Sequence, residues 1–550
     1  MSSLVAILVP FALATLMAVP GAVRSVARRI APLAPLALIP VLLAPAEVEL
    51  GLHLVGVQLG PDAASVPLVW LTLLAWSLAG WLAASHVNRR RTLFWYGWLL
   101  ALGGMNLLLL AGNVVSFYLG YITMSLSAYL LVIHASSSEA WRAGRVYMVM
   151  ALAGEAAILA GVLLLAGQLG NVAFADLLDR PAAEALADGP ARWLLLIGFA
   201  VKLGILPLHL WLPLAHPVAP VPASAILSGV IVKAGLLGWL RMVPAFAADP
   251  PVIGYWLLGF GLLTAFGGVA LGLTQTRIKT VLAYSTISQM GLILCGFSVW
   301  FQMPDERDSV LALLGLLALH HGLNKAALFL ACACQPGATR WRLTLFALPA
   351  ISLAGMPFTT GFLAKDVLKQ GLESAAAGAW IMLLLALTSA ATALLMWKAF
   401  GLARAMTKPG HAAHPGWVLL VLAALTVPWL HGASLDVVSW PDLGKLLESG
   451  WPLLLAVVLI GLSRRFPSRA RLELPEGDLV VLFEHLATRL ARIGRVLPRV
   501  GLPSGWIRTW VAPAQFLLAR LEADEARLPL VGLALLAIAV MLWMVTGMGG

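Results

Sequence analysis

Long apolar runs separated by short polar segments occupy most of the 550-residue chain. Residues 252–273 and 527–546 are two examples, and each has about the 20 residues that a helix needs to cross the hydrocarbon core of a bilayer. Peptide groups in lipid must satisfy one another, so these runs are expected to be helices. The weak period-two alternation of a membrane barrel is absent. The pattern therefore predicts an all-α integral membrane protein.

Length alone predicts about sixteen transmembrane helices. They are expected at residues 4–19, 31–46, 67–85, 93–112, 114–134, 146–167, 191–210, 222–244, 252–273, 279–300, 309–334, 342–364, 376–402, 416–431, 451–464 and 527–546. The charges between these segments check the count, because cytoplasmic loops of membrane proteins collect Lys and Arg.

Basic and acidic loops alternate along the chain. The basic loops hold Arg24, Arg28, Arg29, Arg89, Arg90, Arg91, Arg142, Arg145, Arg277, Lys279, Arg340, Arg342, Arg404, Lys408, Arg464, Arg465, Arg469 and Arg471. The acidic loops hold Glu47, Glu49, Asp176, Asp179, Asp188, Asp305, Glu306, Asp308, Asp436 and Asp442. This alternation predicts a multi-pass protein of the cell (inner) membrane, with the basic loops in the cytoplasm and both termini on the outer face.

Composition agrees with a membrane protein, since 61% of the residues are hydrophobic and only 11% are charged. The net charge of +11 comes from the short loops, so membrane topology explains it and no nucleic-acid partner is expected. Cys295, Cys332 and Cys334 lie in apolar segments and are expected to be small core residues, not a disulfide or a metal site. No metal or cofactor is predicted.

Residues 465–526 are too polar to span a membrane. Within 478–499, four arginines recur at helical spacing and apolar residues fill the opposite stripe. The arginines are Arg489, Arg492, Arg495 and Arg499, and the apolar residues are Phe483, Leu486, Leu490, Ile493 and Leu497. This pattern predicts an amphipathic helix along the cytoplasmic interface or along partner subunits. A plain surface linker is the alternative.

Six ionisable side chains fall inside predicted membrane helices. They are Glu155, Lys202, Lys233, His320, His321 and Lys325. A charge in the middle of a membrane costs several kcal/mol, so each is a candidate functional residue. Buried lysines and imidazoles can take up and release protons when a neighbouring charge moves. Several such groups over three or more helices, with few acids to pair with, favour a hydrophilic proton pathway over structural ion pairs.

Prolines lie close to the same groups. Pro207 and Pro213 follow Lys202, whereas Pro349 and Pro357 fall inside the segment 342–364. Lys365 and Asp366 come directly after that segment. Proline removes a backbone hydrogen bond, and broken helices in corresponding halves of a transporter point to its ion sites. We therefore expect helix breaks at Pro207 and Pro357, although a simple kink is the alternative.

Four segments carry a resemblance to a known family. They are residues 200–244, 277–294 (RIKTVLAYSTISQMGLIL), 320–331 (HHGLNKAALFLA) and 355–366 (GMPFTTGFLAKD). In order and spacing they resemble the antiporter-like subunits of respiratory complex I, a superfamily that includes membrane subunits of group 4 hydrogenases and multi-subunit Na⁺/H⁺ antiporters. The segment 124–132 (MSLSAYLLV) is similar to the hydrogenase and antiporter branch. The similarity covers about residues 95–400.

The resemblance implies two inverted five-helix repeats, each with a broken helix, and a chain of buried groups that carries protons. It places Lys202 at the central lysine of the first repeat and Lys233 at the bridging lysine of the next helix. His321 and Lys325 fall on the helix that leads into the second repeat, and Lys365 falls at the second break beside Asp366. The implied divisions are 1–92 (N-terminal helices), 93–244 and 252–402 (the repeats), 403–464 (C-terminal helices), 465–526 (a lateral helix) and 527–550 (the last transmembrane helix).

Two positions depart from the family. The family has a glutamate in the fifth helix where this chain has Ile122, and an acid where this chain has Leu214. The missing glutamate pairs with the first lysine in the family. Glu155, one helix later, is the predicted substitute.

The expected function is proton or Na⁺ translocation by an antiporter-like subunit of a multi-subunit membrane complex. No chemical reaction is expected in this chain alone, because no redox centre, quinone motif or nucleotide site is recognisable. Redox or antiporter subunits would then drive ion movement. One alternative is the membrane partner of a zinc-binding protein in inorganic-carbon (CO₂ or bicarbonate) uptake. A membrane scaffold without transport is another.

Overall fold

The computed structural model describes residues 1–50, 57–169, 173–177, 189–243, 252–303, 305–375, 377–407, 413–438, 440, 442–465 and 474–475. The amphipathic helix predicted within 465–526 and the transmembrane helix predicted within 527–550 lie outside the described residues.

Helices make up nearly all of the described chain. The α-helices are α1 (Ser2–Ala18), α2 (Ala22–Ile30), α3 (Ile39–Leu43), α4 (Val66–His86), α5 (Arg91–Leu110), α6 (Val114–Val132), α7 (Ser138–Leu169), α8 (Phe174–Leu177), α10 (Pro190–Leu203), α11 (Trp211–Val218), α12 (Val221–Ile226), α13 (Lys233–Met242), α14 (Val252–Leu273), α15 (Ile278–Gln302), α16 (Arg307–Ala331), α17 (Arg340–Ala354), α18 (Thr360–Ser374), α19 (Ala379–Arg404), α20 (Pro415–Ser434) and α21 (Leu443–Arg465). The 3-10 helices η1 (Ala31–Leu38), η2 (Ile133–Ala135) and η4 (Pro336–Ala338) and the π-helix η3 (Leu227–Ile231) continue or connect them.

Twelve helical segments of the described chain are long and apolar enough to cross a membrane. The apolar helix α1 is shorter. The predicted span 342–364 is divided between α17 and α18, and the helix in the predicted span 191–210 ends early, at Leu203. The prediction of a helical multi-pass membrane protein is confirmed, whereas the total of sixteen helices stays a prediction. Arg142 and Arg145, expected in a loop, lie in the first turns of α7. Long basic side chains can extend from a helix end to the membrane surface, so a charged turn need not end the helix.

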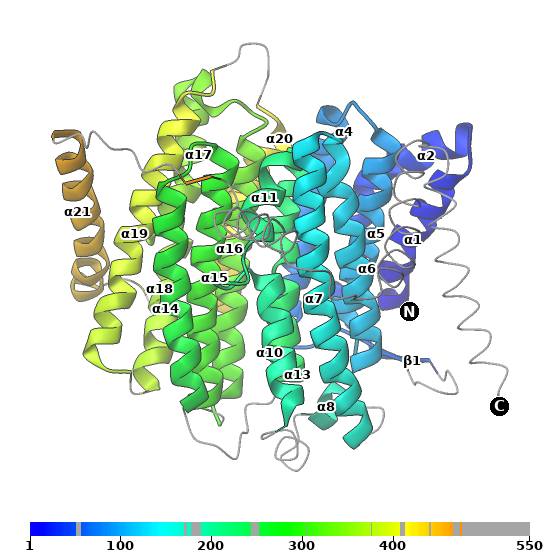
Figure 1. The fold of residues 1–550 in the computed structure, drawn as a ribbon, viewed down its shortest axis with the longest axis horizontal. Coiled ribbons are helices and arrows are strands. Elements are labelled where there is room, and N and C mark those ends of the chain that lie inside the picture. The colour runs from blue at the N-terminus through cyan, green and yellow to red at the C-terminus, as the bar shows by residue number, and fades with distance from the viewer. Residues whose placement is uncertain are drawn as a thin grey trace, which may run out of the picture.

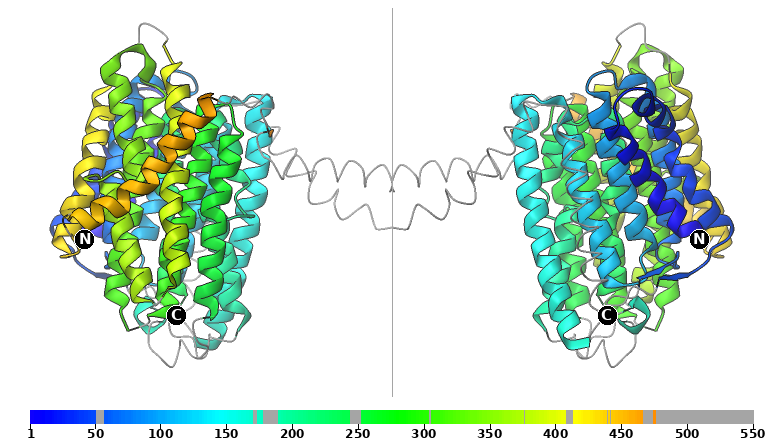
Figure 2. Two further views of the ribbon diagram at one scale, coloured as in Figure 1. Left: turned by 90° about the vertical axis from the view of Figure 1, so that its left-hand side faces the viewer. Right: turned by 90° about the vertical axis from the view of Figure 1, so that its right-hand side faces the viewer.

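The helices stand side by side as an upright bundle (Figure 1). Helices α5, α6, α7, α10 and α13 lie in one half of the view, and α14, α15, α17, α18 and α19 lie in the other. The buried helix α16 runs between the halves and packs against α4, α12, η3 and α20. Helix α21 crosses the edge of the bundle at a tilt and contacts α19 (Figure 2, left).

A small antiparallel hairpin was not expected from the sequence. Strands β1 (Val48–Leu50) and β2 (Val57–Leu59) pair so that Glu49 lies opposite Gln58. Leu59 also forms a bridge with Ala111, just beyond the end of α5. Among the described residues, this hairpin departs from the predicted all-α chain, which is otherwise mostly helical. The hairpin escaped prediction because three-residue strands are too short to show an alternating pattern.

Two helices are interrupted in the middle of the bundle. Helix α10 ends at Leu203, where Gly204 takes a positive φ of 71°, and α11 resumes at Trp211. Helix α17 ends at Ala354, where Gly355 has a φ of 86°, and α18 begins at Thr360. Glycine reaches this left-handed conformation without a steric cost, so both helices can end there. Helices α10 and α17 enter from opposite ends of the bundle (Figure 1).

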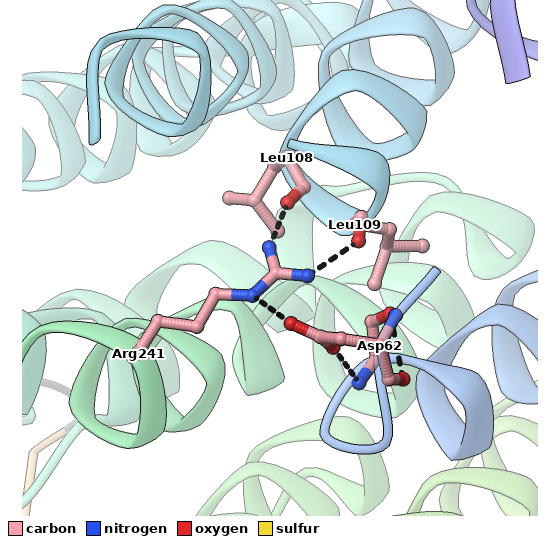
Figure 3. A network of polar contacts seen from close by, with 5 residues as sticks. Asp62, Leu108, Leu109 and Arg241 are labelled. Carbon is pink, nitrogen blue, oxygen red and sulfur yellow. Dashed lines mark hydrogen bonds and ion pairs between the residues drawn. The ribbon is translucent and has the colours of Figure 1, made fainter. Parts of the chain in front are cut away.

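Arg241 ties three elements together at the end of the bundle that carries the acidic loops (Figure 3). Its guanidinium donates to the Asp62 carboxylate at 2.9 Å, to Leu108 O at 2.7 Å and to Leu109 O at 2.8 Å. The two carbonyls belong to the last turn of α5, where a helix has no internal donors left for them. Arg241 is only 2% exposed and thereby fixes the ends of α5 and α13 to the loop before α4.

The contact with Arg241 favours the charged form of the Asp62 carboxyl. Burial alone would raise its pKa, but the Arg241 guanidinium and hydrogen bonds with Ser65 hold the pKa below its usual range. A carboxyl whose pKa is lowered by folding stabilises the folded state above about pH 4, and this contribution is lost as the pH falls below that value.

The substitution Arg241→Met is expected to lower the stability of the purified protein by about 2–4 kcal/mol, because two buried carbonyls and a carboxylate lose their donor. Thermal unfolding in detergent measures the effect. The control is Glu139→Gln, which breaks the ion pair with Arg277 between side chains that are 52% and 44% exposed. Such exposed pairs contribute about 1 kcal/mol or less. The difference between wild type and Arg241→Met should narrow below about pH 4. Equal stability of the two variants would contradict this account.

Candidate functional site

Lys202 and Glu155 lie near each other in the first half of the bundle. Lys202 occupies the last turn of α10, and its Nζ donates to the Ser125 hydroxyl of α6 at 2.5 Å. Glu155 of α7 is 3% exposed, and neither carboxylate oxygen has a hydrogen-bond partner among the described residues. The Glu155 carboxylate lies within electrostatic range of Lys202 and of Ser125. Ser125 therefore stands between an ammonium group and a carboxylate.

Aromatic rings complete the surroundings of Lys202. The rings of Tyr121, Tyr147 and Trp211 have their centroids 5.4, 5.6 and 5.9 Å from its Nζ. Ring faces attract a cation, and so does the partial negative charge at the C-terminal end of α10. The ammonium group is thus stabilised without a direct bond to a carboxylate. A small cavity lined by these residues and by α7 lies beside it.

Lys233 follows an irregular turn. In the π-helix η3, the Val232 N–H bonds Leu227 O, five residues earlier, whereas an α-helix would direct it to Ser228 O. Ser228 O accepts a hydrogen bond from Lys233 Nζ at 2.8 Å. The same Nζ lies 2.7 Å from Nδ1 of His321 on α16. This distance is that of a hydrogen bond, and which of the two residues donates depends on the protonation of the imidazole.

Helix α16 carries three of the predicted residues on adjacent turns. His321 meets Lys233, and Lys325 donates to Leu282 O of α15 at 3.0 Å. His320 faces the other way, with Nδ1 at 2.9 Å from the hydroxyl of Thr360 at the start of α18. Asn324 supports it, because its amide donates to His320 O at 2.8 Å. Thus one helix contacts the first half of the bundle, α15 and the second broken helix.

Lys365 lies at the second interruption. Its Nζ donates to Ala354 O at the end of α17 at 3.1 Å and to the Ser389 hydroxyl of α19 at 2.8 Å. Asp366, its neighbour in sequence, forms an ion pair with Lys445 of α21 at 2.8 Å. These groups line a cavity between α18, α19 and α21. Adjacent residues on a helix point in different directions, so the two members of this sequence pair have separate partners.

The predicted residues form a small number of groups. Lys202 and Glu155 make the first, Lys233, His321 and Lys325 the second, and His320 and Lys365 extend it toward α19. The residues of the second group and its extension lie close enough for their charges to interact. They are Lys233, Lys325, His321, His320 and Lys365. No hydrogen bond among the described residues joins the Lys202 group directly to the Lys233 group.

The interruptions lie beside these groups. Pro207 falls in the segment between α10 and α11, where the Leu206–Pro207 peptide bond is cis, and Pro357 falls between α17 and α18. Sequence analysis missed Ser125, Thr360 and Ser389, which are the hydroxyl partners of the charged residues. Serine and threonine are common in membrane helices, so their type alone gave no signal. Each hydroxyl lies on a different helix from the charge that it contacts, so the spacing along the chain gave none either.

The described residues contain no cluster of three or more His, Cys, Asp or Glu side chains that could hold a metal ion. Cys295, Cys332 and Cys334 are buried and are not joined in a disulfide. The chemistry that these groups offer is the uptake and release of protons or the binding of a small cation.

Comparison with known proteins gives matches of sequence and of fold. A profile of the family described as "NADH:quinone oxidoreductase/Mrp antiporter, TM" matches residues 111–394, which is more than half of the chain. The chain is 35% identical over 237 residues to hydrogenase-4 component B of Escherichia coli (strain K12), a match that covers 42% of this chain and 35% of that protein. It is 30% identical over 295 residues to NADH-quinone oxidoreductase subunit M of Pseudomonas aeruginosa, covering 50% and 56%.

The chain therefore spans only about a third to somewhat more than half of the length of these relatives. Among solved structures, a chain of the Mrp complex from Dietzia sp. DQ12-45-1b is similar in fold, with a TM-score of 0.72 and 19% identity over 95% of this chain and 63% of that chain.

The pairing of Lys202 with Glu155 can be tested without measuring transport. Lys202→Met leaves a buried carboxylate without its countercharge, so it should destabilise the protein more in the presence of Glu155 than in the Glu155→Gln background. The expected coupling is about 1–3 kcal/mol, read as non-additive shifts in thermal unfolding of the single and double variants. Lys202→Met combined with Glu139→Gln is the control, because Glu139 lies far along α7. Additive effects in both pairs would mean that the two charges do not interact.

Proposed function

Because the chain belongs to the NADH:quinone oxidoreductase/Mrp antiporter family of transmembrane proteins, we propose that it carries protons or Na⁺ across the membrane as an antiporter-like subunit of a larger complex. One observation carries the proposal. Buried lysines and histidines follow one another through the bundle, and Lys233 and His321 are close enough to exchange a proton. Buried charges are costly in a membrane, so their accumulation favours a pathway over a scaffold.

Lys202 and Glu155 form the first site of this pathway. The family's glutamate is missing at Ile122, and Glu155 takes over its part as the acid that acts on the first lysine. Its place beside Lys202 and Ser125 supports this assignment. From there the proton passes by way of Lys233, His321 and Lys325 to His320 and Lys365. Asp366 and Lys445 line the cavity next to Lys365 at the far end.

Two inverted five-helix repeats underlie the pathway in this proposal, over residues 93–244 and 252–402. The fourth helix of each is interrupted, α10–α11 in one and α17–α18 in the other, and a lysine lies at each interruption. The half-helices α10 and α17 enter from opposite ends, as inversion requires (Figure 1). With the basic loops in the cytoplasm of an inner-membrane protein, α10 enters from the outer face.

Partners supply the driving force. The names of the relatives describe a component or subunit of a larger assembly, which supports a multi-subunit complex here. Mass spectrometry of the proteins that co-purify with the tagged chain distinguishes between the possible partner subunits. Redox or antiporter subunits place it in an ion pump, whereas a single zinc-binding protein places it in inorganic-carbon uptake.

Ion flux in proteoliposomes tests the proposal. The purified complex is reconstituted, a membrane potential is imposed with K⁺ and valinomycin, and the internal pH and ²²Na⁺ are followed. Lys233→Met and Glu155→Gln should each reduce flux more than about tenfold, because each removes a group that holds the proton. Lys398→Ala is the control, since Lys398 of α19 reaches Leu273 O near the end of α14, away from the pathway.

Two results would overturn the proposal. Flux that is equal in wild type and in Lys233→Met, with intact assembly, would mean that ions do not pass this lysine. No flux above that of empty liposomes, from an assembled complex, would favour a membrane scaffold.

A further inference from the structure

His216 is a buried imidazole that the pathway above does not use. It lies in α11, is fully buried, and its ring stacks on Phe329 of α16 with centroids 4.7 Å apart. Neither ring nitrogen has a hydrogen-bond partner among the described residues. Leaving a buried polar group unsatisfied costs about 1–3 kcal/mol, so an apolar ring would pack here at lower cost. The imidazole is therefore expected to serve a purpose other than packing, with water as its partner.

Hydrogen bonds fix the backbone around His216, whereas the two ring nitrogens make none among the described residues. The Ser224 hydroxyl donates to His216 O at 3.0 Å. Lys279, in the first turn of α15, donates to Pro217 O at 3.3 Å and to Ala219 O at 2.5 Å. Lys279 is partly exposed and belongs to a basic loop, so it lies where the bundle meets the solution.

Toward the interior of the bundle, His216 packs against the part of α16 that carries Lys325. Phe329, on which the ring stacks, lies one helical turn after Lys325 on α16. Lys325 donates to Leu282 O, and Leu282 lies one turn after Lys279 on α15. Three neighbouring helices, α15, α11 and α16, thus carry Lys279, His216 and Lys325 within one or two turns of their mutual contacts. Both ammonium groups lie close enough to act on the charge of the imidazole.

We propose that His216 and Lys279 form the inlet through which a proton from the face with the basic loops reaches Lys325. This inference rests on the proposed function and adds the route by which the second set of buried groups is supplied. Lys279 faces the solution and positions α11 by its two carbonyl bonds. His216 accepts the proton at one ring nitrogen and releases it from the other toward Lys325, so the imidazole is neutral before and after each transfer.

Replacement of the imidazole tests the inlet. His216→Phe keeps a ring stacked on Phe329 but cannot hold a proton, and His216→Gln keeps polar atoms but does not titrate. Both are compared with wild type in the reconstituted complex, with assembly checked by size-exclusion chromatography. His86→Phe is the matched control, since His86 ends α4 at the same face and is partly exposed. We expect both His216 variants to lose about tenfold or more of the proton flux, and the control to keep it.

The outcomes separate this inference from the proposed function. If wild type carries protons, Lys233→Met does not, and His216→Gln carries them at the wild-type rate, the inlet is wrong while the pathway stands. If wild type and Lys233→Met are alike, the proposed function itself fails. Should His216→Phe fail to assemble, the flux of the smaller polar variant His216→Gln decides alone.

Discussion

Carbonyl oxygens at interrupted or irregular helices hold two of the buried ammonium groups of this bundle. Lys365 donates to Ala354, the last residue of α17, and Lys233 donates to Ser228 within the π-helix. Lys202 occupies the last turn of α10, where the end of the helix is partially negative. A regular helix uses its carbonyls internally, so an ammonium group among regular helices finds few free acceptors and is costly to bury. Lys325 is the exception, because it shares Leu282 O of the regular helix α15. The interruptions therefore make it possible for lysines to lie where lipid and apolar side chains exclude bulk water.

Helix α16 connects the two halves because it carries polar groups on several sides. His321 contacts Lys233 of α13, Lys325 contacts α15, and His320 contacts the start of α18. All three are nearly or fully buried, so a change of charge at one is poorly screened from the next. In the proposed pathway, a proton that arrives in one half can therefore influence the buried groups of the other half without a large movement of the helices. The interaction is electrostatic, and its range depends on how dry the interior is.

Apolar length and loop charge predicted the membrane-spanning character, and the resemblance to the antiporter-like superfamily is confirmed by the family match. Predicted spans such as 252–273 agree with the observed helix, because a continuous apolar run leaves little choice of conformation in lipid. The hairpin at Val48–Leu50, the π turn before Lys233 and the hydroxyl partners could not be read from the pattern. The hydroxyl partners depend on contacts between residues far apart in the chain, such as Lys202 with Ser125, and so does the contact of Arg241 with the end of α5. Asp366 was grouped with Lys365 by sequence, but only the fold shows that its carboxylate pairs with Lys445.

Water is the component on which the central claim, a continuous route through the buried groups, depends most. Direct hydrogen bonds link Lys233 to His321, but among the described residues none joins the Lys202 group to the Lys233 group. The most direct measurement is an electron cryomicroscopy map of the assembled complex in lipid, at a resolution that reveals ordered water. The account predicts water density between Lys202 and Lys233 and between His321 and His320. Apolar side chains packed without water across the first interval would contradict a continuous pathway.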